Sequence, residues 1–157
     1  MNIAILDVEA QPDQAPKRVL FLCTENSARS QMAEVLLRYL SQGHIEVYSA
    51  GSRPTQVHPL ALAVLQERGI STEGLRSKSL NEFIGQSFDV IVTVCDRVRE
   101  SCPTFPGDPD CIHWSFADPA AVEGSLEERH RAFEQTSLQL TTRLRYLLIL
   151  LERAHRR

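Results

Sequence analysis

The sequence has no long hydrophobic run and no marked excess of charge of either sign. Its longest apolar stretch near the C-terminus, residues 146–151, is far shorter than the roughly 20 residues that a transmembrane helix needs. The 157 residues carry 17 basic and 20 acidic side chains, and this balance gives no sign of a nucleic-acid-binding surface. We therefore expect a globular protein that acts neither in a membrane nor on nucleic acid.

A secretion signal and a disulfide framework are also missing. The first residues show no basic segment followed by a long apolar core, so we expect no signal peptide and a cytoplasmic location. Four cysteines in such a reducing compartment are more typical of catalytic, metal-binding or incidental thiols than of structural disulfides. A zinc site is the weaker alternative, because the spacings match no usual two-pair finger. Its ligands would be Cys95, Cys102, Cys111 and His113.

We expect neither a metal nor a cofactor, and Cys111 fits better as a small buried residue of the last strand. Residues 1–17 hold a small apolar group and then a segment rich in Pro, Gln and Asp, which is typical of a flexible tail or a linker. Residues 18–157 are long enough to bury a single core. The sequence therefore predicts one domain over residues 18–157, preceded by a tail.

Apolar runs alternate with helical periodicity along this domain. Strands are predicted at residues 19–22, 45–48, 88–94 and 111–114. Helical patterns begin near Ala28, Pro59 and Ser125. The alternation predicts an α/β fold, with an open, mainly parallel four-stranded sheet and helices on both faces.

The ends of the predicted helices carry their own signals. Ser125 and Glu128 form a capping box at the start of the last helix, and Gly43 is the expected C-cap of the first. The last helix has an apolar stripe of Phe133, Leu140, Leu144, Leu147 and Leu151. Residues 77–85 predict a short helical piece with Leu80, Phe83 and Ile84 facing inward.

The stretch 19–33 combines a buried strand, a polar loop and the start of a helix. Cys23 stands at the entrance of the loop and Arg29 at its exit, with five residues between them. Backbone N–H groups in such a turn bind anions, and an arginine adds a planar fork suited to a tetrahedral oxyanion. The same surroundings would lower the pKa of the Cys23 thiol and make it a nucleophile. The simpler alternative is a small hydrophobic residue at a strand end, because this spacing also occurs by chance.

Two more cysteines follow the third predicted strand. Parallel strands bring their carboxyl ends to one edge of a sheet, so we expect Cys95 at the same edge as Cys23. Cys102 follows in a polar segment, from which it would approach Cys95 within disulfide range. One nucleophilic cysteine with two others in reach indicates a thiol relay. The alternative is that Cys95 is a buried strand-end residue and Cys102 is incidental.

Asp118 precedes Pro119 in a loop that follows Trp114 and Phe116. A carboxyl group beside an aromatic wall is able to act as a general acid. An Asp-Pro pair by itself usually marks only a turn, so a catalytic role for Asp118 depends on where the loop lies.

Several separated motifs occur in a characteristic order. They are Cys-Thr-x-Asn-Ser-x-Arg-Ser-Gln-Met-Ala-Glu, the pair Cys95 and Cys102, Cys-Pro-Thr-Phe-Pro-Gly, and His-Trp-x-Phe-x-Asp-Pro-Ala. Together they resemble the arsenate reductases that are built on the low-molecular-weight protein tyrosine phosphatase fold and are usually coupled to thioredoxin. The resemblance covers roughly residues 18–150.

The resemblance implies a role for most residues of the loop. Cys23 would attack arsenate, Asn26 would hold the loop in shape, and Ser30 would hydrogen-bond the Cys23 thiolate. Asp118 would protonate the leaving oxygen. The oxyanion would lie in the loop formed by Thr24, Glu25, Asn26, Ser27, Ala28, Arg29 and Ser30.

The resemblance also implies an order for the relay. Cys95 would attack the Cys23–arsenic adduct, which releases arsenite and leaves a Cys23–Cys95 disulfide. Cys102 would convert it to a Cys95–Cys102 disulfide that thioredoxin reduces. Phosphate and sulfate would compete as oxyanions, weak phosphatase activity would persist, and we expect a monomer.

Two positions depart from the pattern of the family. Ala28 stands where many members carry a second loop cysteine, so no disulfide is possible within the loop. Some reductases bind potassium through a Glu, a Ser and an Asp. Glu34 and Ser49 match the first two, whereas Lys78 falls at the third, where its ammonium would occupy the place of the cation.

Two other functions remain as alternatives. A phosphatase would use Cys23, Arg29 and Asp118 but would have no use for Cys95 and Cys102. A non-enzymatic domain would sense an oxyanion for a partner attached through residues 1–17, and it would need neither a nucleophile nor a relay.

Overall fold

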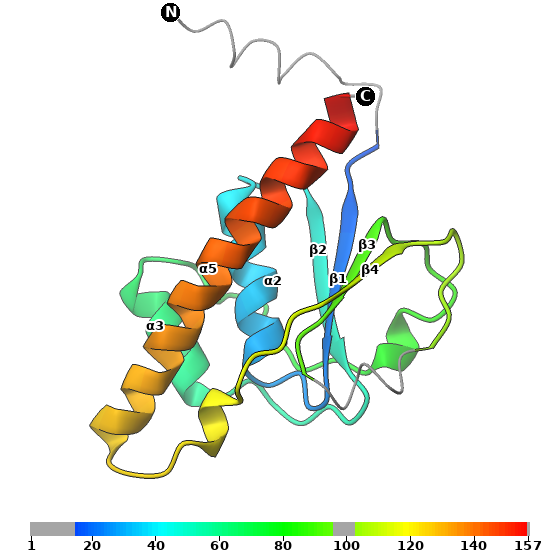
Figure 1. The fold of residues 1–157 in the computed structure, drawn as a ribbon. Coiled ribbons are helices and arrows are strands. Elements are labelled where there is room, and N and C mark those ends of the chain that lie inside the picture. The colour runs from blue at the N-terminus through cyan, green and yellow to red at the C-terminus, as the bar shows by residue number, and fades with distance from the viewer. Residues whose placement is uncertain (1–14, 96–102, 157) are drawn as a thin grey trace, which may run out of the picture.

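The structure is a computed structural model, and it describes residues 15–95 and 103–156 (Figure 1). Its strands are β1 (Arg18–Cys23), β2 (Glu46–Gly51), β3 (Val90–Thr93) and β4 (Asp110–His113). Its helices are α2 (Arg29–Leu40), α3 (Pro59–Glu67) and α5 (Leu126–Arg156), and two 3₁₀ turns are η1 (Leu80–Glu82) and η2 (Pro119–Ala121). None of the helices in these described ranges is long and apolar enough to cross a bilayer.

The four strands form one sheet in the order β2-β1-β3-β4, and every pair is parallel. This confirms the predicted parallel α/β sheet. In the register, Cys23 pairs with Gly51 of β2 and Leu22 pairs with Thr93 of β3. The carboxyl ends of β1, β2 and β3 therefore meet at one edge, and Cys95 follows β3 only two residues beyond Thr93.

Helix α2 begins directly after the loop and packs on β1 and β2. Helix α5 lies along α2 and also contacts α3, as the three neighbouring helices in Figure 1 show. The predicted capping box is present, since the Glu128 N–H donates to Ser125 Oγ at 3.1 Å. The predicted apolar stripe is buried at all five positions, Phe133, Leu140, Leu144, Leu147 and Leu151.

The other face of the sheet is covered by aromatic rings around η1. The Tyr48 ring lies 5.5 Å from the Phe83 ring and 6.0 Å from the Phe88 ring, between centroids. Leu80 and Phe83 are buried as predicted, but the prediction for Ile84 is wrong, because its side chain is 54% exposed. The turn ends at Glu82 and Gly85 adopts a positive φ of 91°, so the chain does not continue the inward-facing side as far as Ile84.

Two other local predictions are corrected. The C-cap of α2 is Ser41 rather than Gly43, and the first left-handed residue is Gln42. The N–H of Gly43 bonds to the Arg38 carbonyl at 3.1 Å, so Gly43 lies one residue beyond the usual glycine position. Cys111 is exposed, not buried, because β4 is an edge strand of the sheet. Residues 1–14, most of the predicted tail, lie outside the described residues.

Candidate active site

The loop between β1 and α2 is held by backbone hydrogen bonds to the next segment of the chain. The N–H groups of Arg53, Thr55 and His58 donate to the carbonyls of residues 24, 25 and 27, at 2.8, 3.1 and 3.0 Å. These bonds tie the loop carbonyls to the segment that follows β2. Gly51 backs the loop so closely that a Cβ atom there would lie 2.6 Å from the Thr24 carbonyl oxygen. The end of β2 therefore shapes the loop, and only glycine leaves room for it.

Asn26 is the most constrained residue of the loop. It is fully buried and has a φ of 51°, a left-handed conformation that is uncommon outside glycine. Its side-chain Nδ2 donates to Ser30 Oγ at 2.8 Å and to Ser49 Oγ at 2.9 Å. Its Oδ1 accepts from the Lys78 N–H at 2.8 Å. In this conformation the Asn26 backbone N–H points at the Cys23 sulfur, 3.2 Å away.

The Cys23 thiol is buried at the bottom of the site. Its Sγ lies 2.8 Å from Ser30 Oγ, in addition to the Asn26 contact. Burial raises the pKa of the Cys23 thiol above its ordinary value, although hydrogen bonds from Ser30 and Asn26 and the charge of Arg29 act in the opposite direction. The expected lowering of this pKa is therefore wrong for the site without an oxyanion. The hydrogen-bond donors and Arg29 lower the pKa of Cys23 as predicted, but the loss of hydration on burial raises it by more.

Arg29 and Asp118 form the opposite wall. Arg29 Nη1 donates to the Phe116 carbonyl at 2.9 Å, and its Nη2 lies 3.8 Å from Asp118 Oδ2. Asp118 Oδ1 accepts from the Ala120 N–H at 3.0 Å and so caps η2. The rings of Phe116 and Trp114, which precede Asp118 in this segment, lie 6.3 Å apart between centroids. The Asp118 carboxyl is thus fixed at the pocket and remains half-exposed.

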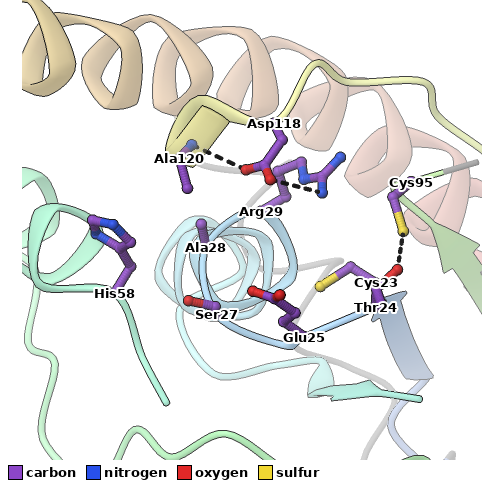
Figure 2. Close-up of a pocket in the computed structure, with 10 residues that line it drawn as sticks. All are labelled: Cys23, Thr24, Glu25, Ser27, Ala28, Arg29, His58, Cys95, Asp118 and Ala120. Carbon is purple, nitrogen blue, oxygen red and sulfur yellow. Dashed lines mark hydrogen bonds and ion pairs between the residues drawn. The ribbon is translucent and has the colours of Figure 1, made fainter. Parts of the chain in front are cut away.

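Both strand-end cysteines open into one pocket of about 430 Å³ (Figure 2). Cys95 is buried, and its Sγ lies 3.3 Å from Thr24 Oγ1, at the loop entrance. The pocket is lined by Cys23, Thr24, Glu25, Ser27, Ala28, Arg29, His58, Cys95, Asp118 and Ala120. The structure therefore brings together four of the five predicted catalytic residues. The fifth, Cys102, lies outside the described residues.

Behind the loop, a buried ionic network joins Glu34, Ser49 and Lys78. Lys78 Nζ lies 3.3 Å from Glu34 Oε1, 3.5 Å from Ser49 Oγ and 3.0 Å from the Arg76 carbonyl oxygen. Ser49 Oγ donates to Glu34 Oε1 at 2.9 Å, and Arg38 reaches Glu34 Oε2 at 3.3 Å. The Lys78 ammonium thus lies among the oxygens that surround Glu34 and Ser49.

Sequence reasoning missed two residues of the site, Gln31 and His58. Gln31 belongs to the motif that begins at Cys23, and it is a polar residue at a buried position of α2. A polar residue on the apolar side of a predicted helix was the signal that could have identified it. His58 precedes Pro59, and its Nδ1 caps α3 by accepting from the Leu60 N–H at 3.1 Å. Partial burial and the charge of Arg129 lower the pKa of His58, while Asp118 acts in the opposite direction.

One cluster of potential metal ligands occurs among the residues that the structure describes. It comprises Glu67, His130 and Glu134, on the surface of α3 and α5. Both ring nitrogens of His130 already contact a carboxylate oxygen, at 2.9 Å for Glu67 and 2.7 Å for Glu134. This exposed cluster shares no residue with the alternative zinc site, and we assign it no metal.

Known proteins with similar sequence and structure share this arrangement of elements. The family model of low molecular weight phosphotyrosine protein phosphatases matches residues 18–157. Arsenate reductases of Halalkalibacterium halodurans and Bacillus subtilis are 35% and 34% identical to the chain over 129 residues, covering 82% of it and 93% of each relative.

Solved structures give the same result. A thioredoxin-dependent arsenate reductase of Corynebacterium glutamicum aligns with a TM-score of 0.72 and 28% identity, covering 97% of this chain and 70% of that one. An arsenate reductase in its oxidized state aligns with a TM-score of 0.73 and 29% identity, covering 86% of this chain and 98% of that one. The chain therefore belongs to the low molecular weight phosphotyrosine protein phosphatase family and, within it, to the arsenate reductases.

Proposed function

We propose that this protein reduces arsenate to arsenite through a relay of Cys23, Cys95 and Cys102, with thioredoxin as the reductant. The observation that carries the proposal is the position of Cys95, whose thiol opens into the same pocket as Cys23. A phosphatase that transfers a phosphoryl group to one cysteine and then to water has no use for a second thiol there. The names of the relatives, arsenate reductases in two bacilli and a thioredoxin-dependent enzyme in Corynebacterium glutamicum, support the same reaction.

In the first step, the loop N–H groups and Arg29 bind the arsenate dianion. The Cys23 thiol is protonated at rest, because burial raises its pKa, so its proton passes to a basic oxygen of the bound arsenate. The thiolate then attacks arsenic, and Asp118 protonates the oxygen that leaves as water. Ser30 Oγ, 2.8 Å from the sulfur, stabilises the thiolate during the attack.

In the second step, the Cys95 thiolate attacks the Cys23 sulfur. The sulfur–arsenic bond breaks, its electron pair stays on arsenic, and arsenite leaves as a disulfide joins Cys23 to Cys95. The Cys102 thiolate then attacks the Cys95 sulfur, which frees Cys23 and forms the Cys95–Cys102 disulfide. The dithiol of thioredoxin supplies the two electrons that restore both thiols. Because the relay needs reduced cysteines, we place the protein in the cytoplasm. We also expect it to act as a monomer, with residues 18–157 as its catalytic domain.

The network behind the loop has a role in the same proposal. The ammonium of Lys78 replaces a bound monovalent cation, because it supplies a tethered positive charge to Glu34 at 3.3 Å. A tethered charge stabilises the loop without recruiting an ion from solution. Arsenate reduction is therefore expected to be independent of potassium.

The relay is tested by mass mapping of single cysteine variants after arsenate treatment. Cys102→Ser should complete one turnover and stop with Cys23 joined to Cys95, whereas Cys95→Ser should not reach that disulfide. Cys23→Ser should be inactive from the first step. Cys111→Ser is the matched control, since this thiol is exposed on β4 and should leave turnover unchanged. Sustained turnover of Cys102→Ser with thioredoxin would contradict the proposed order.

Hydrolysis of an activated aryl phosphate separates the relay from the phosphatase alternative. The loop, the nucleophile and the acid are all present, so weak hydrolysis is expected and should disappear in Cys23→Ser. Hydrolysis should survive in Cys95→Ser and Cys102→Ser, because in the proposed relay these two cysteines take part only in disulfide exchange. Equal loss in all three variants would mean that the later cysteines shape the site instead.

A further inference from the structure

Gln31 is a buried polar residue of α2 that the proposed mechanism does not use. Its side chain is fully buried, and its Nε2 lies 2.9 Å from Asn26 Oδ1, 3.1 Å from the Asn26 carbonyl oxygen and 2.7 Å from the Arg76 carbonyl oxygen. Two N–H groups thus serve three acceptors. Rotating the amide would place its oxygen against these three oxygens, so the nitrogen has to occupy this position.

The other end of this amide has no partner. Gln31 Oε1 is the one buried side-chain nitrogen or oxygen, within the described part of the chain, that makes no hydrogen bond. An unpaired buried acceptor costs free energy, and an apolar side chain of similar size would avoid this cost. The N–H groups of Gln31 are therefore the reason that a carboxamide suits this position, and two of their three contacts are with Asn26.

Asn26 needs such support because it is left-handed, with a φ of 51°. That conformation directs its N–H toward the Cys23 sulfur at 3.2 Å. Gln31 holds both oxygens of Asn26, the backbone carbonyl and Oδ1. Its third contact, with the Arg76 carbonyl, ties the loop to the segment of Lys78, whose Nζ bonds to that same carbonyl at 3.0 Å.

We propose that Gln31 is a positioning residue of the active site, which keeps the Asn26 N–H on the Cys23 sulfur and couples the oxyanion loop to the Lys78 segment. Its importance for turnover rests on the proposed function. Its effect on the Cys23 thiol does not, because alkylation of that thiol is measured without arsenate. An alkylation assay therefore tests the inference separately from arsenate reduction.

The experiment measures the rate of iodoacetamide alkylation of the Cys23 peptide against pH, by mass spectrometry of the full chain. Gln31→Met removes the N–H groups and keeps the length of the side chain. The thiolate of Cys23 loses the support of the Asn26 N–H in this variant, so alkylation near neutral pH should slow about tenfold. The other ionisable residues that line the pocket, Glu25, Arg29, His58, Cys95 and Asp118, are the same in both proteins.

Val35→Ala is the matched control. Val35 is buried on the same helix and makes no polar contact with the loop, so this variant should lose stability without a shift in the alkylation profile. Gln31→Asn is a second test if Gln31→Met does not fold, because its shorter side chain keeps the amide but does not reach Asn26. In an Asn26→Gly background the effect of Gln31→Met should shrink, since glycine adopts the left-handed conformation unaided.

An unchanged Cys23 profile in folded Gln31→Met or Gln31→Asn would overturn the inference. A shift of the same size in Val35→Ala would also overturn it, because the effect would then follow from general destabilisation. If the Cys23 alkylation profile shifts in Gln31→Met but neither the wild type nor any variant reduces arsenate, the inference holds and the proposed function fails.

Discussion

Replacing Lys78 by methionine should expose how much the tethered ammonium contributes. The Lys78 and Glu34 side chains are 9% and 5% exposed, so this is a buried ion pair. Breaking a buried pair by removing one partner costs about 3–5 kcal/mol, because the remaining charge is left without compensation. Arg38 still contacts Glu34 Oε2 at 3.3 Å, but its side chain is 48% exposed and its charge is partly screened. We therefore expect a loss near the lower end, about 3 kcal/mol.

The loss is measured by thermal unfolding of wild type, Lys78→Met and Lys17→Met. For a domain of this size 1 kcal/mol corresponds to about 2–4 °C, so Lys78→Met should melt about 6–12 °C below wild type. Lys17→Met removes the same charge from the other lysine of the chain. Lys17 lies 3.9 Å from Asp89 at the surface, and such a pair contributes less than about 1 kcal/mol.

The same proteins are then compared in potassium and sodium chloride at equal ionic strength, because screening alone changes surface electrostatics. Wild type should show the same melting temperature and arsenate reduction in both salts. Lys78→Met should be stabilised more by potassium, since the oxygens of Glu34, Ser49 and Arg76 remain in place without their ammonium. Potassium activation of wild type, or equal destabilisation by Lys78→Met and Lys17→Met, would refute this reasoning.

Three further outcomes follow from the site. Gly51→Ala should cost about 1–3 kcal/mol and lower arsenate reduction at least about tenfold, because the new Cβ meets the Thr24 carbonyl at 2.6 Å; unchanged kinetics would show that the loop tolerates displacement. Burial raises the native pKa of Cys23, so above about pH 8.5 the native state binds more protons than the unfolded chain. The free energy of unfolding, measured with urea, should therefore fall as pH rises, and Cys23→Ser should remove this slope. The native pKa of His58 is lowered, so the unfolded chain binds more protons below about pH 6.5 and stability should fall there as pH falls. His58→Asn keeps a cap for α3 and should show a smaller slope, and an equal slope would contradict this assignment.

Much of the fold follows from local patterns in the sequence. The capping box of Ser125 and Glu128 depends on residues three apart, and the apolar runs at β1 and β3 depend on neighbours in the chain. The position of Cys95 follows from a general rule, because parallel strands end at one edge. Two of the errors occurred where strand order or turn length decides exposure. Cys111 is exposed because β4 is an edge strand, and Ile84 is exposed because η1 is a single short turn.

The sequence by itself determined which residue types stand at the loop, from Cys23 to Arg29, and that a cysteine follows β3. Only the tertiary structure decided how they interact. The pKa of Cys23 is raised because burial outweighs the nearby donors, and the burial of a residue depends on how the whole domain packs. Gln31 meets the Arg76 carbonyl, 45 residues away in sequence, only because the chain folds back behind the loop. Contacts between segments far apart in sequence depend on the packing of the whole domain, and they alone complete this site.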